Sequence, residues 1–172
     1  PISGANIRRV EARVPPHAVQ IVCEPVARRR RPQSAYAAQF SIQYGVACAL
    51  LRGRFGLADL ETHGDPELLA LADRVEYSVD HDTNYPVHFS GEVIVTLSDG
   101  VTLRRREAIN LGAADNPLSE ADIVGKFLAN AALALPSARA EGIRDAILGI
   151  GRLADAGELA RALAKDGAAP AA

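Results

Sequence analysis

The sequence contains no methionine and no tryptophan, only two cysteines among its 172 residues, and few aromatic residues, which make up 5% of the chain. Because no methionine is present to serve as an initiator, we expect the chain to begin partway into a longer polypeptide. Cys23 and Cys48 lie in apolar surroundings and lack metal-ligand spacing. We therefore expect both to be reduced, buried thiols rather than metal ligands.

Long hydrophobic runs and an excess of one charge are also missing. No apolar run approaches the roughly 18 residues needed to span a bilayer, and no signal-peptide pattern opens the chain. Nineteen basic and 21 acidic side chains give a net charge of −2, which provides no overall attraction to nucleic acid or to a membrane. We therefore expect a cytoplasmic protein of one domain, or one domain with a helical appendage. We expect it to bind neither nucleic acid nor a membrane.

Strand patterns occur at several separated places along the chain. Apolar and charged residues alternate over residues 7–14 and 75–79, which predicts two half-buried strands. A less regular β-prone stretch spans residues 19–26, and the four arginines at 28–31 predict a basic loop. The order of strands, helices, three strands and further helices lacks the regular alternation of a parallel fold. We therefore predict an α+β fold whose mainly antiparallel sheet packs with several helices.

The clearest local geometry is the hairpin whose loop is formed by residues 98–100, Ser-Asp-Gly. A two-residue Asp-Gly turn would set apolar residues opposite polar ones, whereas a three-residue loop pairs Leu97 with Val101. We predict the three-residue loop, with Gly100 in the left-handed conformation and a bulge beside it.

Capping residues mark the expected helices. Ser34, Asp65 and Ser119 each stand where a side-chain oxygen can accept from the first turn, and Gly53 is placed to end a helix. The small-residue tail at 167–172 is expected to be frayed. The predicted helices span residues 35–53, 65–74, 119–135, 138–150 and 155–164.

The helix predicted at 35–53 is rich in small apolar residues, yet it carries Ser41 and Tyr44 in its interior. Helical spacing places both residues on one face with Ala37 and Cys48. A helix buried on most sides must either satisfy its hydroxyl groups internally or use them at a site. Two interpretations are open: a hydrogen-bonded packing feature, or a tyrosine at a cleft that donates to a substrate carboxylate or relays a proton.

Two further groups of residues have alternative interpretations. His81 and His88 flank one predicted loop and, with Asp80 and Asp82, form the polar cluster best suited to a metal ion; surface histidines are the alternative. The arginines at 28–31 form a solvated loop, a site that recognises a carboxylate or phosphate, or a nucleic-acid contact. Nucleic-acid binding is disfavoured because no aromatic platform accompanies the arginines.

Several segments together resemble the MmgE/PrpD family, which includes 2-methylcitrate dehydratase and cis-aconitate decarboxylase. They are residues 39–44 (Gln-Phe-Ser-Ile-Gln-Tyr) and 116–119 (Asn-Pro-Leu-Ser) within a similarity that covers roughly residues 5–165. The resemblance implies a two-domain, cofactor-free enzyme, commonly a homodimer, whose large helical N-terminal domain lies under a smaller α+β lid. This chain is similar to the lid only. We therefore expect a lid domain at 1–166, a flexible tail at 167–172, and no N-terminal helical domain in this chain.

The family's chemistry removes a proton α to a carboxylate and expels water or carbon dioxide, or epimerises the centre. The resemblance implies that the full-length protein is a lyase, of the hydro-lyase type, acting on a small di- or tricarboxylate such as 2-methylcitrate. Tyr44 occupies the position of a tyrosine that lines the active cleft of related decarboxylases, and Ser41 is the second candidate. Arg31 is a candidate for binding the polycarboxylate, and no metal ligand is expected.

Because this fragment offers hydroxyl groups and arginines but no obvious base, we expect it to be inactive by itself. The alternative is a non-catalytic α+β dimerisation or interaction module that retains the lid fold.

Overall fold

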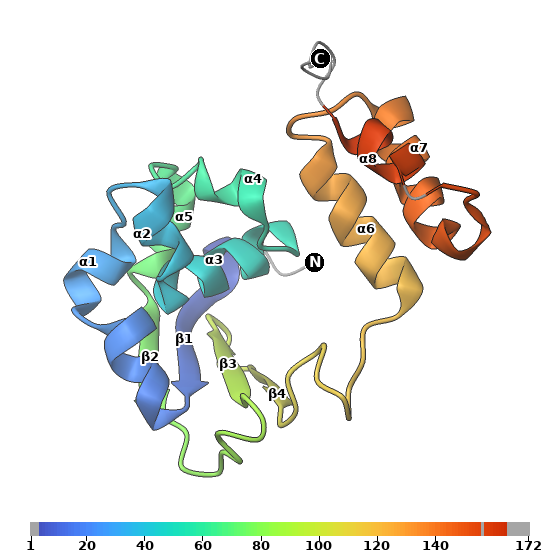
Figure 1. Ribbon diagram of the computed structural model, residues 1–172. Coiled ribbons are helices and arrows are strands. Elements are labelled where there is room, and N and C mark those ends of the chain that lie inside the picture. Colours follow the sequence, from blue (N-terminus) through green and yellow to red (C-terminus); the bar gives the residue numbers. More distant parts are fainter. Residues whose placement is uncertain (1–3, 156, 165–172) are drawn as a thin grey trace. The chain divides into compact units, whose positions relative to one another are not determined.

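A four-stranded sheet of order β2-β1-β3-β4 forms within the described residues, 4–155 and 157–164, of this computed structural model (Figure 1). β1 pairs in parallel with β2, while β1 with β3 and β3 with β4 are antiparallel. The predicted α+β fold with a mainly antiparallel sheet is therefore confirmed. The strands are Ile7–Val14 (β1), Val75–Val79 (β2), Gly91–Leu97 (β3) and Thr102–Glu107 (β4).

The chain divides into two compact units, residues 1–117 and 118–172, and each is described by itself. In the first unit, β1 alternates buried apolar residues on the helix-facing side of the sheet with charged residues on the other side, as the period of two requires. Its core joins that side of the sheet to the helices that pack on it. The core residues include Val10, Ala12, Tyr44, Ala47, Cys48, Leu68, Leu71 and Val75.

The hairpin between β3 and β4 has the predicted three-residue loop. The N–H of Leu97 donates to the carbonyl of Val101 at 2.8 Å, and the N–H of Gly100 donates to the carbonyl of Leu97. Gly100 has φ +90°, the left-handed conformation that favours glycine. The prediction of register and bulge is confirmed because only this pairing keeps the apolar residues of both strands on one face.

The strand predicted at 19–26 is wrong, and so is the basic loop at 28–31. After a 3-10 turn, Pro16–Ala18 (η2), the chain forms a π-helical turn, Val19–Cys23 (η3), and then the helix Val26–Arg30 (α1). A main-chain hydrogen bond closes this turn: the Glu24 N–H donates to the Val19 carbonyl. The Glu24 carboxylate then accepts from the N–H of Val26, the first residue of the arginine-rich helix.

The single helix predicted at 35–53 is interrupted. It consists of Ala35–Gln39 (α2) and Ile42–Arg52 (α3), separated by a short break at Ser41. Ser34 caps the first piece as predicted, and the Ser41 hydroxyl accepts from the Tyr44 N–H to cap the second. The break arises because a serine side chain competes with the helical backbone for hydrogen bonds. Gly53, at φ 70°, ends α3 as predicted.

Two further helices complete the first unit. Asp65 caps the helix Pro66–Ala72 (α5), as predicted, by accepting from the Glu67 N–H. The short helix Leu57–Leu60 (α4) lies between α3 and α5 in the sequence and was not predicted. It is only four residues long, which is too short for a helical period to be recognised in the sequence. A 3-10 turn, Gly4–Asn6 (η1), precedes β1.

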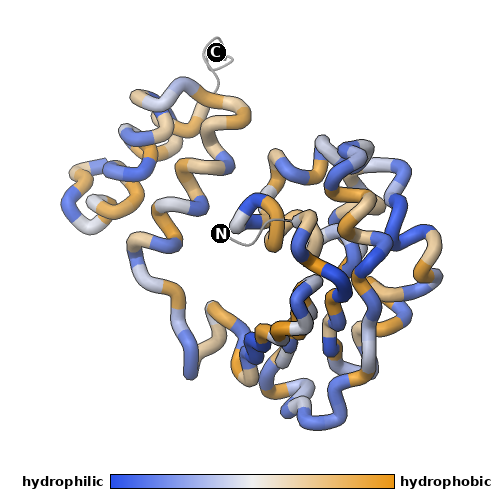
Figure 2. Tube along the Cα trace, turned by 180° about the vertical axis from the view of Figure 1, so that it is seen from behind, coloured by the Kyte–Doolittle hydropathy of each residue, from blue (hydrophilic) through white to orange (hydrophobic). Residues whose placement is uncertain are grey.

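The second unit consists of helices: Glu120–Ala131 (α6), Ser137–Leu148 (α7) and Gly157–Leu163 (α8), with the 3-10 turn Ile150–Arg152 (η4). Ser119 and Asp122 form the expected reciprocal capping box of α6. The predicted tail at 167–172 lies outside the described residues. Along the helices of both units, hydrophobic and hydrophilic residues alternate at short intervals (Figure 2). None of the described helices is long and apolar enough to cross a membrane.

Candidate functional site

Tyr44, the leading candidate from the sequence, lies on the inner face of α3 and is 0% exposed. Its hydroxyl donates to the main-chain carbonyl of Asp59 at 2.6 Å and lies 3.3 Å from the hydroxyl oxygen of Thr62. The Phe55 ring packs edge-on against its ring. The predicted cleft-facing side of this helix is therefore interior in this chain, because the segment after α3 covers it. The catalytic role of Tyr44 stays a prediction.

Arg52, at the end of α3, organises the polar group around that hydroxyl. One of its terminal nitrogens donates to the Asp59 carboxylate at 3.0 Å and to the Thr62 hydroxyl at 2.7 Å, and the other donates to Asp65 at 2.8 Å. The Thr62 hydroxyl in turn donates to the Asp59 carbonyl at 2.8 Å. A continuous network therefore joins Tyr44 to two carboxylates through one arginine. We call Tyr44, Arg52, Asp59, Thr62 and Asp65 the tyrosine network.

The network favours a neutral tyrosine and an ionised aspartate. Burial raises the pKa of Tyr44, so its hydroxyl stays protonated, and it donates a hydrogen bond to the Asp59 carbonyl. Burial also opposes ionisation of Asp59, but hydrogen bonds from the Gly56 N–H and from Arg52, together with the nearby arginine charges, outweigh it. They hold the pKa of that carboxyl below its usual value. The network can therefore donate a hydrogen bond but offers no free base.

Ser41, the second candidate, is also buried and fully engaged. Its hydroxyl donates to the Arg29 carbonyl at 2.5 Å while it accepts from the Tyr44 N–H at 3.0 Å. The two bonds tie the end of α1 to the beginning of α3. Ser41 and Tyr44 thus lie on the same helix, but their hydroxyl groups contact different neighbours.

Arg31, the substrate-binding candidate, lies at the C-terminal end of α1 on the surface. Its guanidinium donates to the Asp73 carboxylate at 2.5 Å, and both side chains remain largely exposed. Arg31 is not among the contacts of Tyr44 or Ser41. The structure therefore brings together Ser41 and Tyr44 but not Arg31.

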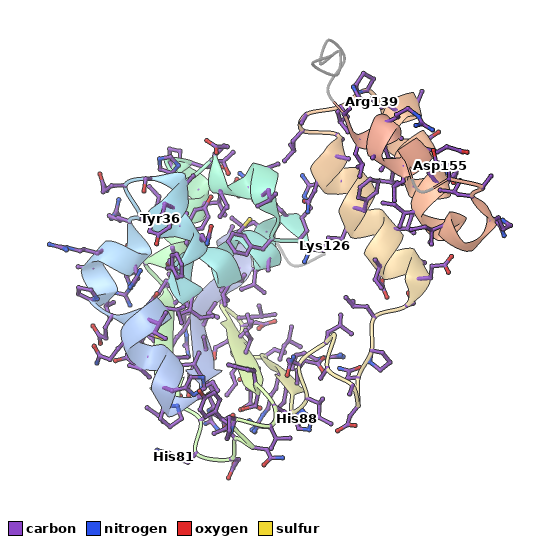
Figure 3. The ribbon with its side chains drawn as sticks, in the orientation of Figure 1. Tyr36, His81, His88, Lys126, Arg139 and Asp155 are labelled. Carbon is purple, nitrogen blue, oxygen red and sulfur yellow. The ribbon has the colours of Figure 1, made fainter. Side chains whose placement is uncertain are left out.

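His81 and His88 lie on the connection between β2 and β3 (Figure 3). The neighbouring Asp80 is buried and accepts from the Ser90 hydroxyl at 2.7 Å and from Arg106 at 3.0 Å. His88 instead lies 3.3 Å from the carboxylate of Asp115. Among the residues that the structure describes, no three His, Cys, Asp or Glu side chains are grouped to hold a metal ion.

The two cysteines are buried free thiols, as expected. Burial raises the pKa of Cys23 to about 11 and also raises that of Cys48, so neither is an activated nucleophile.

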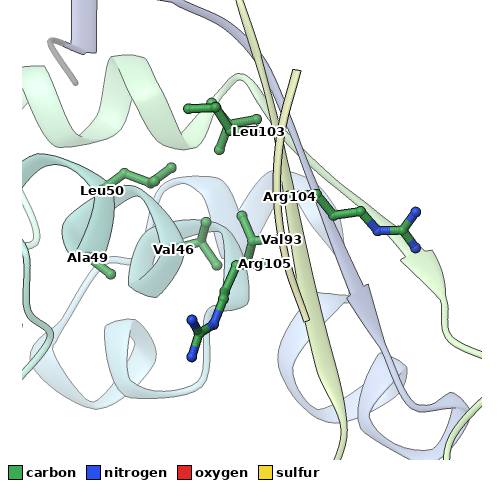
Figure 4. A pocket seen from close by; sticks show the side chains of 8 residues that line it. Val46, Ala49, Leu50, Val93, Leu103, Arg104 and Arg105 are labelled. Atoms are coloured by element: carbon green, nitrogen blue, oxygen red, sulfur yellow. The ribbon is translucent and has the colours of Figure 1, made fainter. Parts of the chain in front are cut away.

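An open apolar cavity of about 300 Å³ lies on the opposite side of α3 from Tyr44, between this helix and the β3–β4 hairpin (Figure 4). It is lined by Val46, Ala49 and Leu50 of the helix and by Val93 and Leu103 of the strands. Arg105 points to the same side, whereas Arg104 points to the other face of the sheet. The sequence did not identify this cavity because its two walls are far apart along the chain.

The residues around Tyr44 were also missed. Asp59 and Thr62 lie 15 and 18 positions from it, in a segment without a motif. The available signal was a helix-terminal arginine, Arg52, followed by a connection that contains two aspartates, Asp59 and Asp65.

The four-stranded, mostly antiparallel sheet and the helices packed on it make the first unit an α+β domain. The sequence-family model of the MmgE/PrpD C-terminal domain matches residues 1–150, and the chain belongs to this family. It is 30% identical to mouse (Mus musculus) cis-aconitate decarboxylase over 131 residues and 34% identical to the human (Homo sapiens) enzyme over the same length. Each match covers 73% of this chain and 25% of the relative, so the chain spans about a quarter of these relatives.

Proposed function

We propose that this chain is the C-terminal domain of a cofactor-independent lyase whose substrate is a small di- or tricarboxylate. The observation that carries the proposal is the family match over residues 1–150, together with the similarity to two cis-aconitate decarboxylases. The reaction is dehydration, decarboxylation or epimerisation next to a carboxylate, with 2-methylcitrate and cis-aconitate as the substrates to test first. A polypeptide that supplies the base completes the site, in a homodimeric, cytoplasmic enzyme.

In this proposal Tyr44 supplies a hydrogen-bond donor rather than a base. Its raised pKa keeps the hydroxyl protonated at neutral pH, which suits a hydrogen-bond donor that stabilises charge developing on a carboxylate. Since the hydroxyl is bonded to the Asp59 carbonyl here, the segment covering it must shift for substrate to reach it. Ser41 supports Tyr44 by capping α3, and Arg31 attracts the anionic substrate from the surface.

The test uses the full-length protein, assayed for loss of 2-methylcitrate and of cis-aconitate by chromatography. Tyr44→Phe removes only the hydroxyl and is expected to lower kcat by about 10²-fold or more, the size of effect typical of losing one hydrogen bond to developing charge, with the fold retained. Tyr36→Phe is the matched control because Tyr36 is 73% exposed on α2, and it should keep full activity. Unchanged turnover in Tyr44→Phe would assign this tyrosine to packing alone.

A second candidate function is a non-catalytic dimerisation or interaction module with the same fold. The specific observation in its favour is that the hydroxyl groups of Tyr44 and Ser41 are both satisfied within the chain, while Arg31 is paired with Asp73. Under this function the full-length protein turns over neither acid, and Tyr44→Phe changes stability only.

A further inference from the structure

β4 forms an outer edge of the described sheet, and its main chain has one row of unused hydrogen-bonding groups. Leu97 and Val101 form the hydrogen-bonded pair next to the loop, and such pairs alternate along an antiparallel ladder. The main-chain groups of Leu103 and Arg105 therefore bond to β3. Those of Thr102, Arg104 and Arg106 point away from the sheet, where another strand can pair with them.

The helix-facing side of this edge is open and is apolar at Val101 and Leu103, while the exposed Arg105 follows farther along the strand and pairs with Glu107. Val101 is 49% exposed and Leu103 41% exposed, and Leu103 borders the cavity of about 300 Å³ beside α3. A strand added to β4 would place every second side chain on this side, next to Ala49 and Leu50 (Figure 4). Apolar side chains fit there.

The other side of the same edge carries Arg104 and Arg106, each paired with one buried carboxylate. Arg104 is 59% exposed, whereas its partner Glu92 has a fully buried carboxylate that also lies 3.4 Å from Arg13. Arg106 similarly covers the buried Asp80. Because Glu92 lies beneath Arg104, the Arg104 guanidinium is the more exposed charged group of the two, whereas the Arg106 side chain is 27% exposed. Acidic side chains on an added strand would lie opposite them.

We propose that the β4 edge binds an extended polypeptide segment in which acidic and apolar residues alternate, by antiparallel strand addition. The acidic residues lie opposite Arg104 and Arg106, and the apolar residues fill the cavity beside α3. A second copy of this chain fits less well, because antiparallel pairing centred on β4 sets Arg104 directly against the same arginine of the other copy. This binding site does not depend on the proposed reaction.

The probe is a fluorescein-labelled peptide, Glu-Val-Glu-Val-Glu-Val-Glu, titrated with the protein and followed by fluorescence anisotropy. The peptide with lysine in place of each glutamate is the charge control and should not bind. In antiparallel pairing the glutamate N–H groups face β4, so N-methylation of the glutamates should abolish binding while N-methylation of the valines is tolerated. Equal binding of both methylated peptides would overturn strand addition.

Thr102 offers variants that remove no arginine pair, and its exposed side chain lies on the same face of the edge as Arg104 and Arg106. Thr102→Glu should weaken binding of the acidic peptide and Thr102→Lys should strengthen it, with about a tenfold difference between the two. Arg8, an exposed residue of β1, is the control: Arg8→Glu should change affinity little. Identical affinities for both Thr102 variants would contradict the predicted site.

Hydrogen exchange measured by NMR reports on the edge itself. The amides of Thr102, Arg104 and Arg106 should exchange fast in the free protein and slowly with the acidic peptide bound. Slow exchange without peptide would show that the edge is already covered and would overturn the proposal. In that case sedimentation velocity tests whether a second copy of the chain protects the β4 edge. A dimeric free protein whose dimer is altered by Thr102→Glu would identify the second copy.

Discussion

Arg52 connects more of the first unit than its place at the end of a helix suggests. Its guanidinium contacts Asp59, Thr62 and Asp65, and through them it holds the connection between α3 and α5 over Tyr44. The carboxylate of Asp59 is almost fully buried, so its ionised form depends on these donors. The free energy of unfolding is therefore expected to be sensitive to this one side chain.

Arg52→Gln should lower the free energy of unfolding by about 2–3 kcal/mol, because it leaves a buried carboxylate without its main ionic partner. Chemical denaturation followed by circular dichroism measures the change. Arg54→Gln is the control: Arg54 is largely exposed and lies 3.6 Å from the same carboxylate, so less than about 1 kcal/mol should be lost. Equal losses in both variants would show that the carboxylate is solvated.

Among the elements, the β3–β4 hairpin has the geometry most directly determined by local sequence. Its loop needs one residue at positive φ, and Gly100 has φ +90° with open space around the position of a side chain. Gly100→Ala should therefore lower the free energy of unfolding by about 1–2 kcal/mol through backbone strain alone. Differential scanning calorimetry of the variant against the parent measures the loss.

Gly64→Ala is the matched control for the hairpin prediction, since Gly64 also has open space but no positive φ. It should leave the stability nearly unchanged or raise it slightly. A stable Gly100→Ala protein would mean that the hairpin adopts another turn.

The elements that sequence predicted correctly are those determined by neighbouring residues. The alternation of apolar and polar residues predicted β1 and β2, and the pairing of apolar residues across the strands predicted the hairpin register. Capping residues such as Asp65 predicted where helices begin. The strand at 19–26 was predicted wrongly because the β-branched residues there satisfy their backbone in a local turn without a neighbouring strand. The break at Ser41 was missed because one hydroxyl outweighs an otherwise continuous helical pattern.

The candidate site was predictable only in part. The sequence singled out Ser41 and Tyr44 because hydroxyl groups on an apolar helix need partners, and the structure supplies those partners. The partners themselves, the carbonyls of Arg29 and Asp59, could not be predicted, because every residue has a main-chain carbonyl and the residue type does not mark which one accepts. Arg31 was chosen for its charge, and its pairing with Asp73 depends on how two distant segments fold together.

At the scale of the whole molecule, the two units differ in how much apolar surface each buries. The first unit has the sheet and a core built from three strands and several helices. In the described part of the second unit, the buried hydrophobic residues are Ala140 and Ile143, while Ile123 and Ile147 are exposed. A small helical unit with so little buried surface gains too little hydrophobic free energy to offset its loss of chain entropy.

Residues 1–117 expressed alone should therefore unfold cooperatively, whereas residues 118–172 alone should show partial helicity that decreases gradually on heating. Thermal circular dichroism at 222 nm and the dispersion of amide signals in an NMR spectrum distinguish the two behaviours. Within 118–172, Ser119→Ala removes the cap of α6 and should lower the residual helicity further, since local propensity is then the main source of order. A sharp thermal transition for 118–172, unaffected by Ser119→Ala, would show instead that its helices form a stable core of their own.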